Sequence, residues 1–222
     1  PFTTPVLPSG TLYDVYVRSN CSGTNQSTWS IAGSGSTKAP NDECINAIPI
    51  PVNPDTFCVD SVDGSLIGAT NSNLGTVCTG VSNNDVWFQF TATQAMHILS
   101  LDNIVGNVTT LYTVLYSGDC AGGLTQIECD NFTDFNSINT YNNLVPGTTY
   151  YVKIYTTTVP AVTTYTACIL SPLPPIRTSN NEYTVPELVT EILINNPCAN
   201  VENVTWSTSS NSTGPLGIGY FE

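Results

Sequence analysis

The chain has 222 residues, of which 41% are hydrophobic and only 9% charged, and its formal net charge is −13. Four Lys and Arg against 17 Asp and Glu form no basic patch, which argues against nucleic acid or an anionic membrane surface as a partner. No apolar run approaches the ~20 residues of a membrane span, so we expect no membrane insertion in this segment.

Eight cysteines are scattered along the chain, with no Cys-x-x-Cys pair and a single His. This pattern argues against a zinc site and favours disulfides, hence an oxidising, extracellular location. The chain begins with Pro1 and Phe2, without Met or a signal sequence, so we expect it to be a piece of a longer exported protein.

A turn followed by a strand is predicted at Leu7–Arg18, where Tyr13, Val15 and Val17 occupy alternate positions. Together with Ser27–Ser30, this pattern resembles the last two strands of a fibronectin type III module, although a generic hairpin would share it. We therefore predict that residues 1–37 are the end of such a module. The Gly- and Ser-rich residues 33–40 read as a flexible linker.

Residues 38–171 form the predicted main domain. Its strand candidates are short, rich in β-branched and aromatic residues, and bounded by turn residues: Asp85–Phe90, His97–Leu101, Leu111–Tyr116, Tyr150–Tyr155 and Tyr165–Leu170. These strands predict an all-β fold, an antiparallel β-sandwich of jelly-roll or immunoglobulin-like type.

The turn-strand pattern of the first unit recurs at Leu144–Tyr155. Pro146 and Gly147 predict a turn, and Tyr150 then occupies the place that Tyr13 has in the first unit. We expect each of these tyrosines to send its hydroxyl back to the backbone of the preceding corner, as in the tyrosine corner of Greek-key sandwiches.

Several motifs of the main domain resemble a β-sandwich module of large surface proteins of the Bacteroidota: Asn41–Ile50, Gly68–Asn71, Asp85–Ala92, Leu115–Cys120, Ile127–Asp130 and Gly147–Tyr155. In that group the module accompanies fibronectin-like repeats in adhesins, as well as secreted peptidases and glycan-degrading enzymes. The resemblance implies type IX secretion, an outer cell-surface location and no catalytic residues.

The last part of the chain contains the strongest helix signal. After a Pro-rich linker at residues 172–181, Thr184–Glu187 forms a capping box, and an apolar stripe follows at Leu188, Val189, Ile192 and Leu193. Residues 182–222, a short α+β segment, resemble the beginning of a choice-of-anchor L domain of the same surface proteins.

Disulfide pairs are predicted from the spacing of the cysteines. Cys120 and Cys129 are separated by a short Gly-rich loop between two strand ends, so we expect them to pair. The other sandwich cysteines, Cys44, Cys58, Cys78 and Cys168, allow three pairings. We favour Cys44 with Cys58, because a single apolar hairpin joins them.

Two oxygen-rich segments are candidate calcium sites, because calcium prefers six to eight oxygen ligands. The candidate ligands are Asp42 and Glu43 in the first segment, and Asp130, Asn131 and Asp134 in the second. Neither segment matches the 12-residue calcium loop, and ordinary turns use the same residue types.

Tyr151, Lys153 and Tyr155 are the candidate glycan-binding residues. If Tyr150 faces the core, these three side chains face the opposite way and form a platform on which a sugar can stack. The alternative is that they pack against a covering segment. Ser61, in Asp-Ser-Val, resembles an O-glycosylation acceptor of the Bacteroidota.

Catalysis is not expected. His97 is the single His and lies at the head of an apolar strand, which leaves acid-base chemistry to carboxylates alone. We therefore predict a non-catalytic, structural and adhesive segment of a bacterial cell-surface protein, whose partners are neighbouring modules of the same protein and surface glycans. The alternative is a carbohydrate-binding module that serves a catalytic domain elsewhere in the protein.

Overall fold

The computed structural model describes residues 6–23, 25–75, 77–108, 110–132 and 138–172. The described residues belong to one compact unit that ends at Leu173. The predicted helix near Thr184 and the segment resembling a choice-of-anchor domain lie outside the described residues. Within the described part, no helix has the length and apolar character needed to cross a membrane.

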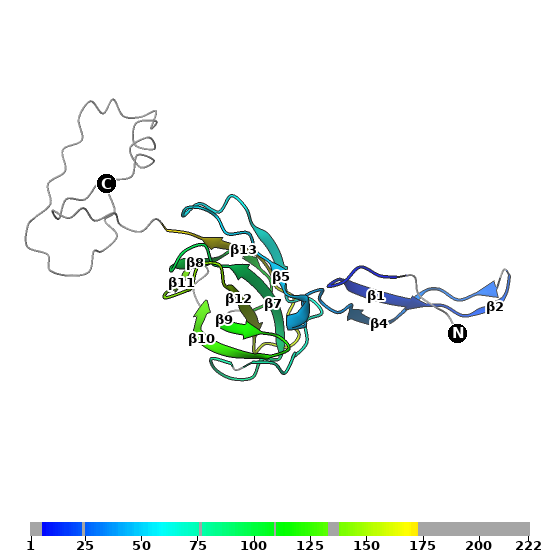
Figure 1. Cartoon of the computed structure of the whole chain (residues 1–222). Helices are drawn as coiled ribbons and strands as arrows, with labels where there is room; N and C mark the ends of the chain where they lie inside the picture. The colour runs from blue at the N-terminus through cyan, green and yellow to red at the C-terminus, as the bar shows by residue number, and fades with distance from the viewer. Residues whose placement is uncertain (1–5, 24, 76, 109, 133–137, 173–222) are drawn as a thin grey trace, which may run out of the picture. The chain divides into compact units, whose positions relative to one another are not determined.

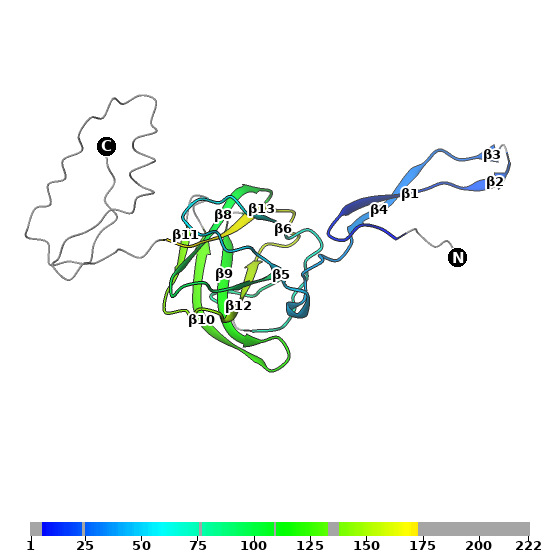
Figure 2. The same ribbon diagram turned by 45° about the horizontal axis from the view of Figure 1, so that its top comes forward.

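The main domain is a sandwich of two sheets around a common core (Figures 1 and 2). The five-stranded sheet has the order β10 (Gly123–Phe132), β9 (Leu111–Asp119), β12 (Thr149–Thr156), β7 (Asn84–Thr91) and β5 (Ile48–Pro49). The four-stranded sheet has the order β11 (Ile138–Tyr141), β8 (His97–Val105), β13 (Thr164–Leu170) and β6 (Val62–Ser65). All neighbours are antiparallel except β5 and β7, so the predicted fold class is confirmed.

Alternation of side chains builds the core between the sheets. Val86, Phe88 and Phe90 of β7 point inward, as do Val152 and Ile154 of the neighbouring strand β12. The five strands predicted from the sequence all exist, as β7, β8, β9, β12 and β13. Their β-branched and aromatic residues fit a pleated surface that is buried on at least one side.

An aromatic cluster joins the two sheets at one end of this core. Phe90 stacks on Tyr150 at 5.9 Å between ring centroids, and on Tyr141 of the other sheet at 6.3 Å. Such pairs stabilise by about 0.5–1.5 kcal/mol beyond the burial of their area. The cluster therefore fixes how the two layers meet at the end where β12 begins.

The tyrosine corner predicted at Tyr150 is confirmed. The backbone N–H of Val145 donates to the Tyr150 hydroxyl at 2.8 Å. Gly147 takes a φ of +82° in the turn between them, a conformation that glycine adopts without strain. Tyr13 differs, because its hydroxyl has no hydrogen-bond partner among the described residues.

Strand β10 was missed by the sequence analysis, and its length makes the predicted Cys120–Cys129 disulfide wrong. The register of the hairpin pairs Gly123 with Asp119 and Cys129 with Val114. Cys129 therefore lies far along the hairpin from the turn that contains Cys120, at about 20 Å for six residues of strand. Instead, Cys78 pairs with Cys129, and Cys44 pairs with Cys120.

The favoured Cys44–Cys58 pair is also wrong, because the two residues lie on opposite faces of the sandwich. Cys44 packs in a small cluster on the outer face of the five-stranded sheet. Cys58 pairs with Cys168, which points away from the core because its neighbours Ala167 and Ile169 point into it. All six predicted disulfide cysteines are thus bonded, and each of the three bonds joins residues 51 to 110 positions apart.

The first unit is an antiparallel hairpin of β1 (Leu12–Val17) and β4 (Ser30–Ser36), with a smaller pair, β2 (Asn20–Ser22) and β3 (Asn25–Gln26), between them in sequence. The prediction of a flexible linker at residues 33–40 is wrong, because β4 continues to Ser36 and Thr37 donates its N–H to Thr11. The glycine- and serine-rich composition would allow a flexible backbone, but hydrogen bonds to β1 hold these residues in a strand.

Removing the hydroxyl of Tyr150 tests the importance of the corner. We expect Tyr150→Phe to lower the free energy of unfolding by about 1 kcal/mol, because the Val145 N–H loses its partner. Urea unfolding followed by tryptophan fluorescence measures the change.

Tyr165→Phe is the matched control, because the Tyr165 hydroxyl is buried without a hydrogen-bond partner among the described residues. Its removal should change stability by less than about 0.5 kcal/mol or increase it slightly. Equal losses in both variants would show that the hydrogen bond at the corner contributes nothing specific.

Candidate functional site

The predicted glycan platform faces outward from the core but does not reach the surface. Tyr150 points into the main core, as expected, and Tyr151 and Tyr155 pack on the opposite face of the sheet. However, Lys153 is 1% exposed and Tyr155 is fully buried. The prediction of an exposed platform is therefore wrong. The alternative prediction holds, because another segment of the chain covers these side chains.

The covering segment comprises residues 71–75 and 77–83, here called the covering loop. Leu74, Val77 and Cys78 pack against the small cluster on the outer face of the five-stranded sheet. The Tyr155 hydroxyl accepts hydrogen bonds from the N–H groups of Cys78 (3.0 Å) and Thr79 (3.2 Å), and donates to the Thr79 carbonyl (3.0 Å). A residue expected to bind sugar thus organises the backbone above it.

A buried ion pair lies beneath the covering loop. The Lys153 ammonium is 3.4 Å from Asp85 Oδ2 and donates to the Leu74 carbonyl at 3.0 Å. Both side chains are at most 1% exposed. The ammonium also lies 5.4 Å from the centroid of the Trp87 ring, within reach of a cation–π interaction.

Both oxygens of the Asp85 carboxylate accept hydrogen bonds. Oδ2 accepts from Ser82 Oγ (2.6 Å) and from the Ser72 N–H (3.1 Å), and Oδ1 accepts from Trp87 Nε1 (3.1 Å). Burial lowers the pKa of Lys153, and the charge and hydrogen bond of Asp85 oppose this effect. Because every partner of the pair belongs to the covering loop or to β7, the two charges hold the loop on the sheet.

The candidate calcium ligands are not gathered by the described part of the chain. Asp42 is buried, and its carboxylate accepts from the Thr70 N–H and from Thr70 Oγ1 (2.6 Å). Lys38 Nζ lies 2.9 Å from Asp42 and 2.7 Å from Glu43. Among the described residues, no cluster of three or more metal-ligating side chains includes Asp42, Glu43 or Asp130.

Asp134 lies outside the described residues, and Asn131 lies on the edge strand β10 with Asp130. The calcium site therefore remains a prediction. One cluster of acidic and sulfur groups does occur, at Cys58, Asp102 and Cys168. The two sulfurs are joined in a disulfide, so they are not available as thiolate ligands.

His97 is fully buried and has structural partners at both ring nitrogens. Nε2 accepts from the N–H groups of Thr93 (3.0 Å) and Gln94 (3.3 Å), and Nδ1 lies 3.1 Å from the Leu170 carbonyl. The pattern fits a neutral ring protonated at Nδ1. Burial lowers the pKa of His97, and the hydrogen bond to Leu170 opposes the shift.

Ser61, the candidate acceptor, is exposed on the segment before β6. Asn53 organises this segment from a fully buried position. Its Oδ1 accepts from the N–H groups of Val59 (3.0 Å) and Asp60 (2.8 Å), and its Nδ2 donates to the carbonyl of Ile169 (3.1 Å). The amide of one side chain thus connects the segment to β13, beside the Cys58–Cys168 disulfide.

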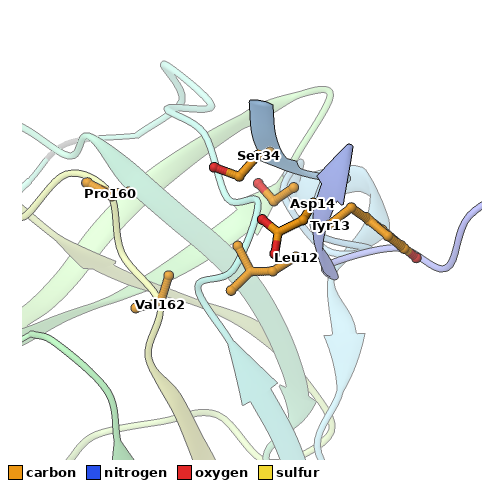
Figure 3. Close-up of a pocket in the computed structure, with 8 residues that line it drawn as sticks. Leu12, Tyr13, Asp14, Ser34, Pro160 and Val162 are labelled. Carbon is orange, nitrogen blue, oxygen red and sulfur yellow. The ribbon is translucent and has the colours of Figure 1, made fainter. Parts of the chain in front are cut away.

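Shallow openings on the surface of the described residues are candidate ligand sites, and they include the following two. A shallow groove beside β5 and β7 is lined by apolar and uncharged polar residues: Pro49, Ile50, Val52, Gln89, Phe90, Thr91, Thr93 and Thr149. The second opening lies between the hairpin and residues Pro160 and Val162 (Figure 3). In this view the Tyr13 side chain points away from Pro160 and Val162, so few side chains converge on the opening.

Sequence reasoning missed the two polar residues that organise the covering segments, Asp85 and Asn53. A signal existed for Asp85, because a charged residue two positions before Trp87 shares its side of the strand. Lys153 offers the complementary charge on the same face of the next strand. Asn53 carries no comparable local pattern.

Breaking the buried ion pair should destabilise the fold strongly. We expect Lys153→Met to lower the free energy of unfolding by about 3–5 kcal/mol, because Asp85 is left as a buried charge without its counter-ion. The double variant Lys153→Met/Asp85→Asn should recover part of this loss. Lys38→Met is the control and should cost less, because the Lys38 ammonium is half exposed and Asp42 keeps its hydrogen bonds from Thr70. A double variant as unstable as the single one would contradict this account.

Acid should destabilise the sandwich through His97. Because the pKa of His97 is lower in the folded state, the unfolded chain binds a proton first as the pH falls below about 6.5. Stability is therefore lost as the pH falls from about 6.5 towards the lower pKa of the folded state, by up to about 1.4 kcal/mol per pH unit. Urea unfolding at several pH values measures this slope. His97→Gln, which stays neutral, should flatten it, and an unchanged slope would assign the effect to other groups.

Two protein families match the chain. The Galactose binding domain-like family, associated with type IX secretion, matches residues 40–168, and the Choice-of-anchor L domain matches residues 177–222. No curated protein matches the chain significantly. Both domain types, together with the three disulfides, fit a non-catalytic module of a modular cell-surface protein of the Bacteroidota. Because the first match spans more than half of the chain, the chain belongs to the galactose-binding-domain-like family associated with type IX secretion.

Proposed function

We propose that this chain is a structural and adhesive segment of an exported bacterial surface protein, without catalytic activity of its own. One observation carries the proposal: the side chains best suited to chemistry hold the fold together. His97, Asp85 and Lys153 are all buried, and each has its polar atoms engaged by the backbone or by another side chain. Acid-base catalysis needs such groups within reach of a substrate.

The hairpin supports the view that this segment stands next to other modules. Several of its large apolar side chains are half or more exposed: Leu12, Val15, Tyr16, Val17, Trp29 and Ile31. A two-stranded sheet is marginally stable by itself, so we propose that further strands of a fibronectin type III-like module pack on it. In this proposal residues 1–37 end that module and residues 38–171 form the sandwich. Residues 172–181 are a linker, and residues 182–222 begin the anchor domain.

A carbohydrate-binding role is the second candidate, and the groove beside β5 and β7 favours it. Thr91 and Thr149 place their hydroxyls 3.2 Å apart on its rim, and Gln89 adds an amide. Ile50 and Phe90 supply an apolar floor. No charged residue lines the groove, which suits a neutral sugar that is recognised by hydroxyl hydrogen bonds and apolar contact.

Ser61 would carry a covalently attached glycan rather than bind a free one. It is exposed next to a backbone held by Asn53, which presents the acceptor hydroxyl to a modifying enzyme. We propose it as the O-glycosylation site of the sandwich. Intact mass measurement of the exported protein, compared with Ser61→Ala, tests this assignment.

Binding and turnover assays distinguish the two candidate functions. We expect the purified chain to hydrolyse no peptide, ester or glycoside substrate. We also expect it to bind neutral glycans weakly as a single copy, and about 10²–10⁴-fold more strongly when copies are linked. Glycan arrays and surface plasmon resonance, with single and linked copies, measure both quantities.

Matched variants locate any binding. Thr91→Val and Thr149→Val replace hydroxyls of the groove by methyl groups of similar size, and they should abolish glycan binding. Thr125→Val makes the same change at an exposed position of β10 and should have no effect. Tight binding by a single copy would favour the carbohydrate-binding module, and turnover that disappears when a pair of acids is replaced would establish an enzyme instead.

A further inference from the structure

The base of the hairpin is closed by its own backbone. Gly10 donates its N–H to the Lys38 carbonyl at 2.9 Å, and Thr37 donates its N–H to the Thr11 carbonyl at 3.0 Å. Thr37 also accepts, through Oγ1, from the Thr11 N–H at 3.1 Å. The turn before β1 and the residues after β4 therefore form one closed unit.

This closed unit contacts the sandwich backbone directly. Ala39 donates its N–H to the Gly68 carbonyl at 3.1 Å. Gly68 has a φ of +72°, and a Cβ atom at this position would lie 1.8 Å from the Thr37 carbonyl oxygen. On the other side, a Cβ atom at Gly10 would lie 3.5 Å from the Ile67 carbonyl oxygen and 3.5 Å from Pro40 Cδ. Gly68 thus permits a close approach of backbones that a side chain would obstruct, whereas a Cβ atom at Gly10 would make ordinary van der Waals contacts.

A series of ion-pair and hydrogen-bond contacts, here called the polar clamp, connects this region to the sheet through Lys38, Asn41, Asp42 and Thr70. Lys38, at the base of the hairpin, pairs with Asp42, and Asp42 is held in turn by Thr70. Thr70 accepts from the Asp85 N–H at 3.0 Å, and Asn41 exchanges hydrogen bonds of 2.8 and 2.9 Å with the backbone of Trp87. Both Asp85 and Trp87 belong to β7, so the clamp ends on a central element of the sandwich.

No flexible linker separates the hairpin from this contact. Strand β4 ends at Ser36, and Thr37 is already the residue that lies against Gly68. A flexible linker needs several residues without fixed partners. Here the residues from Thr37 to Asp42 each have a backbone or side-chain contact, or stand directly between two residues that do.

We infer that Gly68, Thr70 and Asp42 form a seat on the sandwich for the base of the preceding hairpin, residues 8–11 and 37–38. The seat couples the two units so that they move as one body. The consequence goes beyond surface display or sugar binding, because it concerns how a displacement of one module is passed to the next. A module that ends in β1 and β4 would therefore fix the orientation of this sandwich. The two would not rotate freely about residues 33–40.

Distance measurements between spin labels test the seat in the 222-residue chain. Cys21, which is exposed and has no disulfide partner among the described residues, carries one label, and Thr125→Cys on the exposed edge strand carries the other. Cys198→Ser removes the one cysteine that lies outside the described residues. Double electron–electron resonance then reports the width of the distance distribution. We expect a narrow distribution in this parent, and about twofold broadening in Gly68→Ala, where the new methyl group meets the Thr37 carbonyl.

Gly147→Ala is the matched control, because Gly147 has a similar positive φ of +82° and nothing within 4 Å of the position of a Cβ atom. It introduces the same backbone strain without touching the seat, and its distribution should stay narrow. Lys38→Met loosens the clamp without a steric clash and should broaden the distribution by less than Gly68→Ala. A broad distribution in the parent, or equal broadening in Gly147→Ala, would overturn the inference.

Discussion

The structure depends on one constraint: the central strands β7, β12 and β9 of the five-stranded sheet are buried on both faces, although only one face lies against the second sheet. The main core uses the inward side chains of β7 and β12, such as Phe88 and Val152. The outward side chains, Trp87 and Tyr155, need a second cover, because large aromatic rings are costly to leave in water. The covering loop supplies it. The Lys153–Asp85 pair holds the loop in place, with Leu74, Ser72 and Ser82 as hydrogen-bond partners.

The same solution recurs on the other side of the sandwich. In the four-stranded sheet, the segment around Cys58 is attached to β13 by the disulfide to Cys168 and is organised by Asn53. Each cover combines a disulfide with a buried polar side chain that satisfies the backbone of a segment without regular structure. Such segments carry many polar backbone groups that would otherwise be buried without partners. Disulfides add stability that does not depend on a large core, which suits a module exposed outside the cell.

This use of polar residues bears on function. Residue types that often serve catalysis or recognition, such as His97, Lys153 and Tyr155, are engaged in holding segments together. The surface that remains is low in positive charge and rich in hydroxyl and amide groups, which favours weak contacts with neutral glycans or with neighbouring modules. Such contacts gain strength through repetition. A stiff connection to the preceding hairpin would let repeated modules act together.

The sequence by itself determined the fold class, the five main strands and the corner at Tyr150, because alternation and turn residues are local properties that a strand carries with it. It also placed Tyr151, Lys153 and Tyr155 on the face opposite Tyr150. Only the tertiary structure decided what lies over that face and which cysteines meet, since those contacts join residues 51 to 110 positions apart. It likewise turned residues 33–40 from a flexible composition into a paired strand and a fixed connection. A local pattern reports the direction in which a side chain points. It contains no information about the distant segment that packs there, because that choice depends on the path of the whole chain.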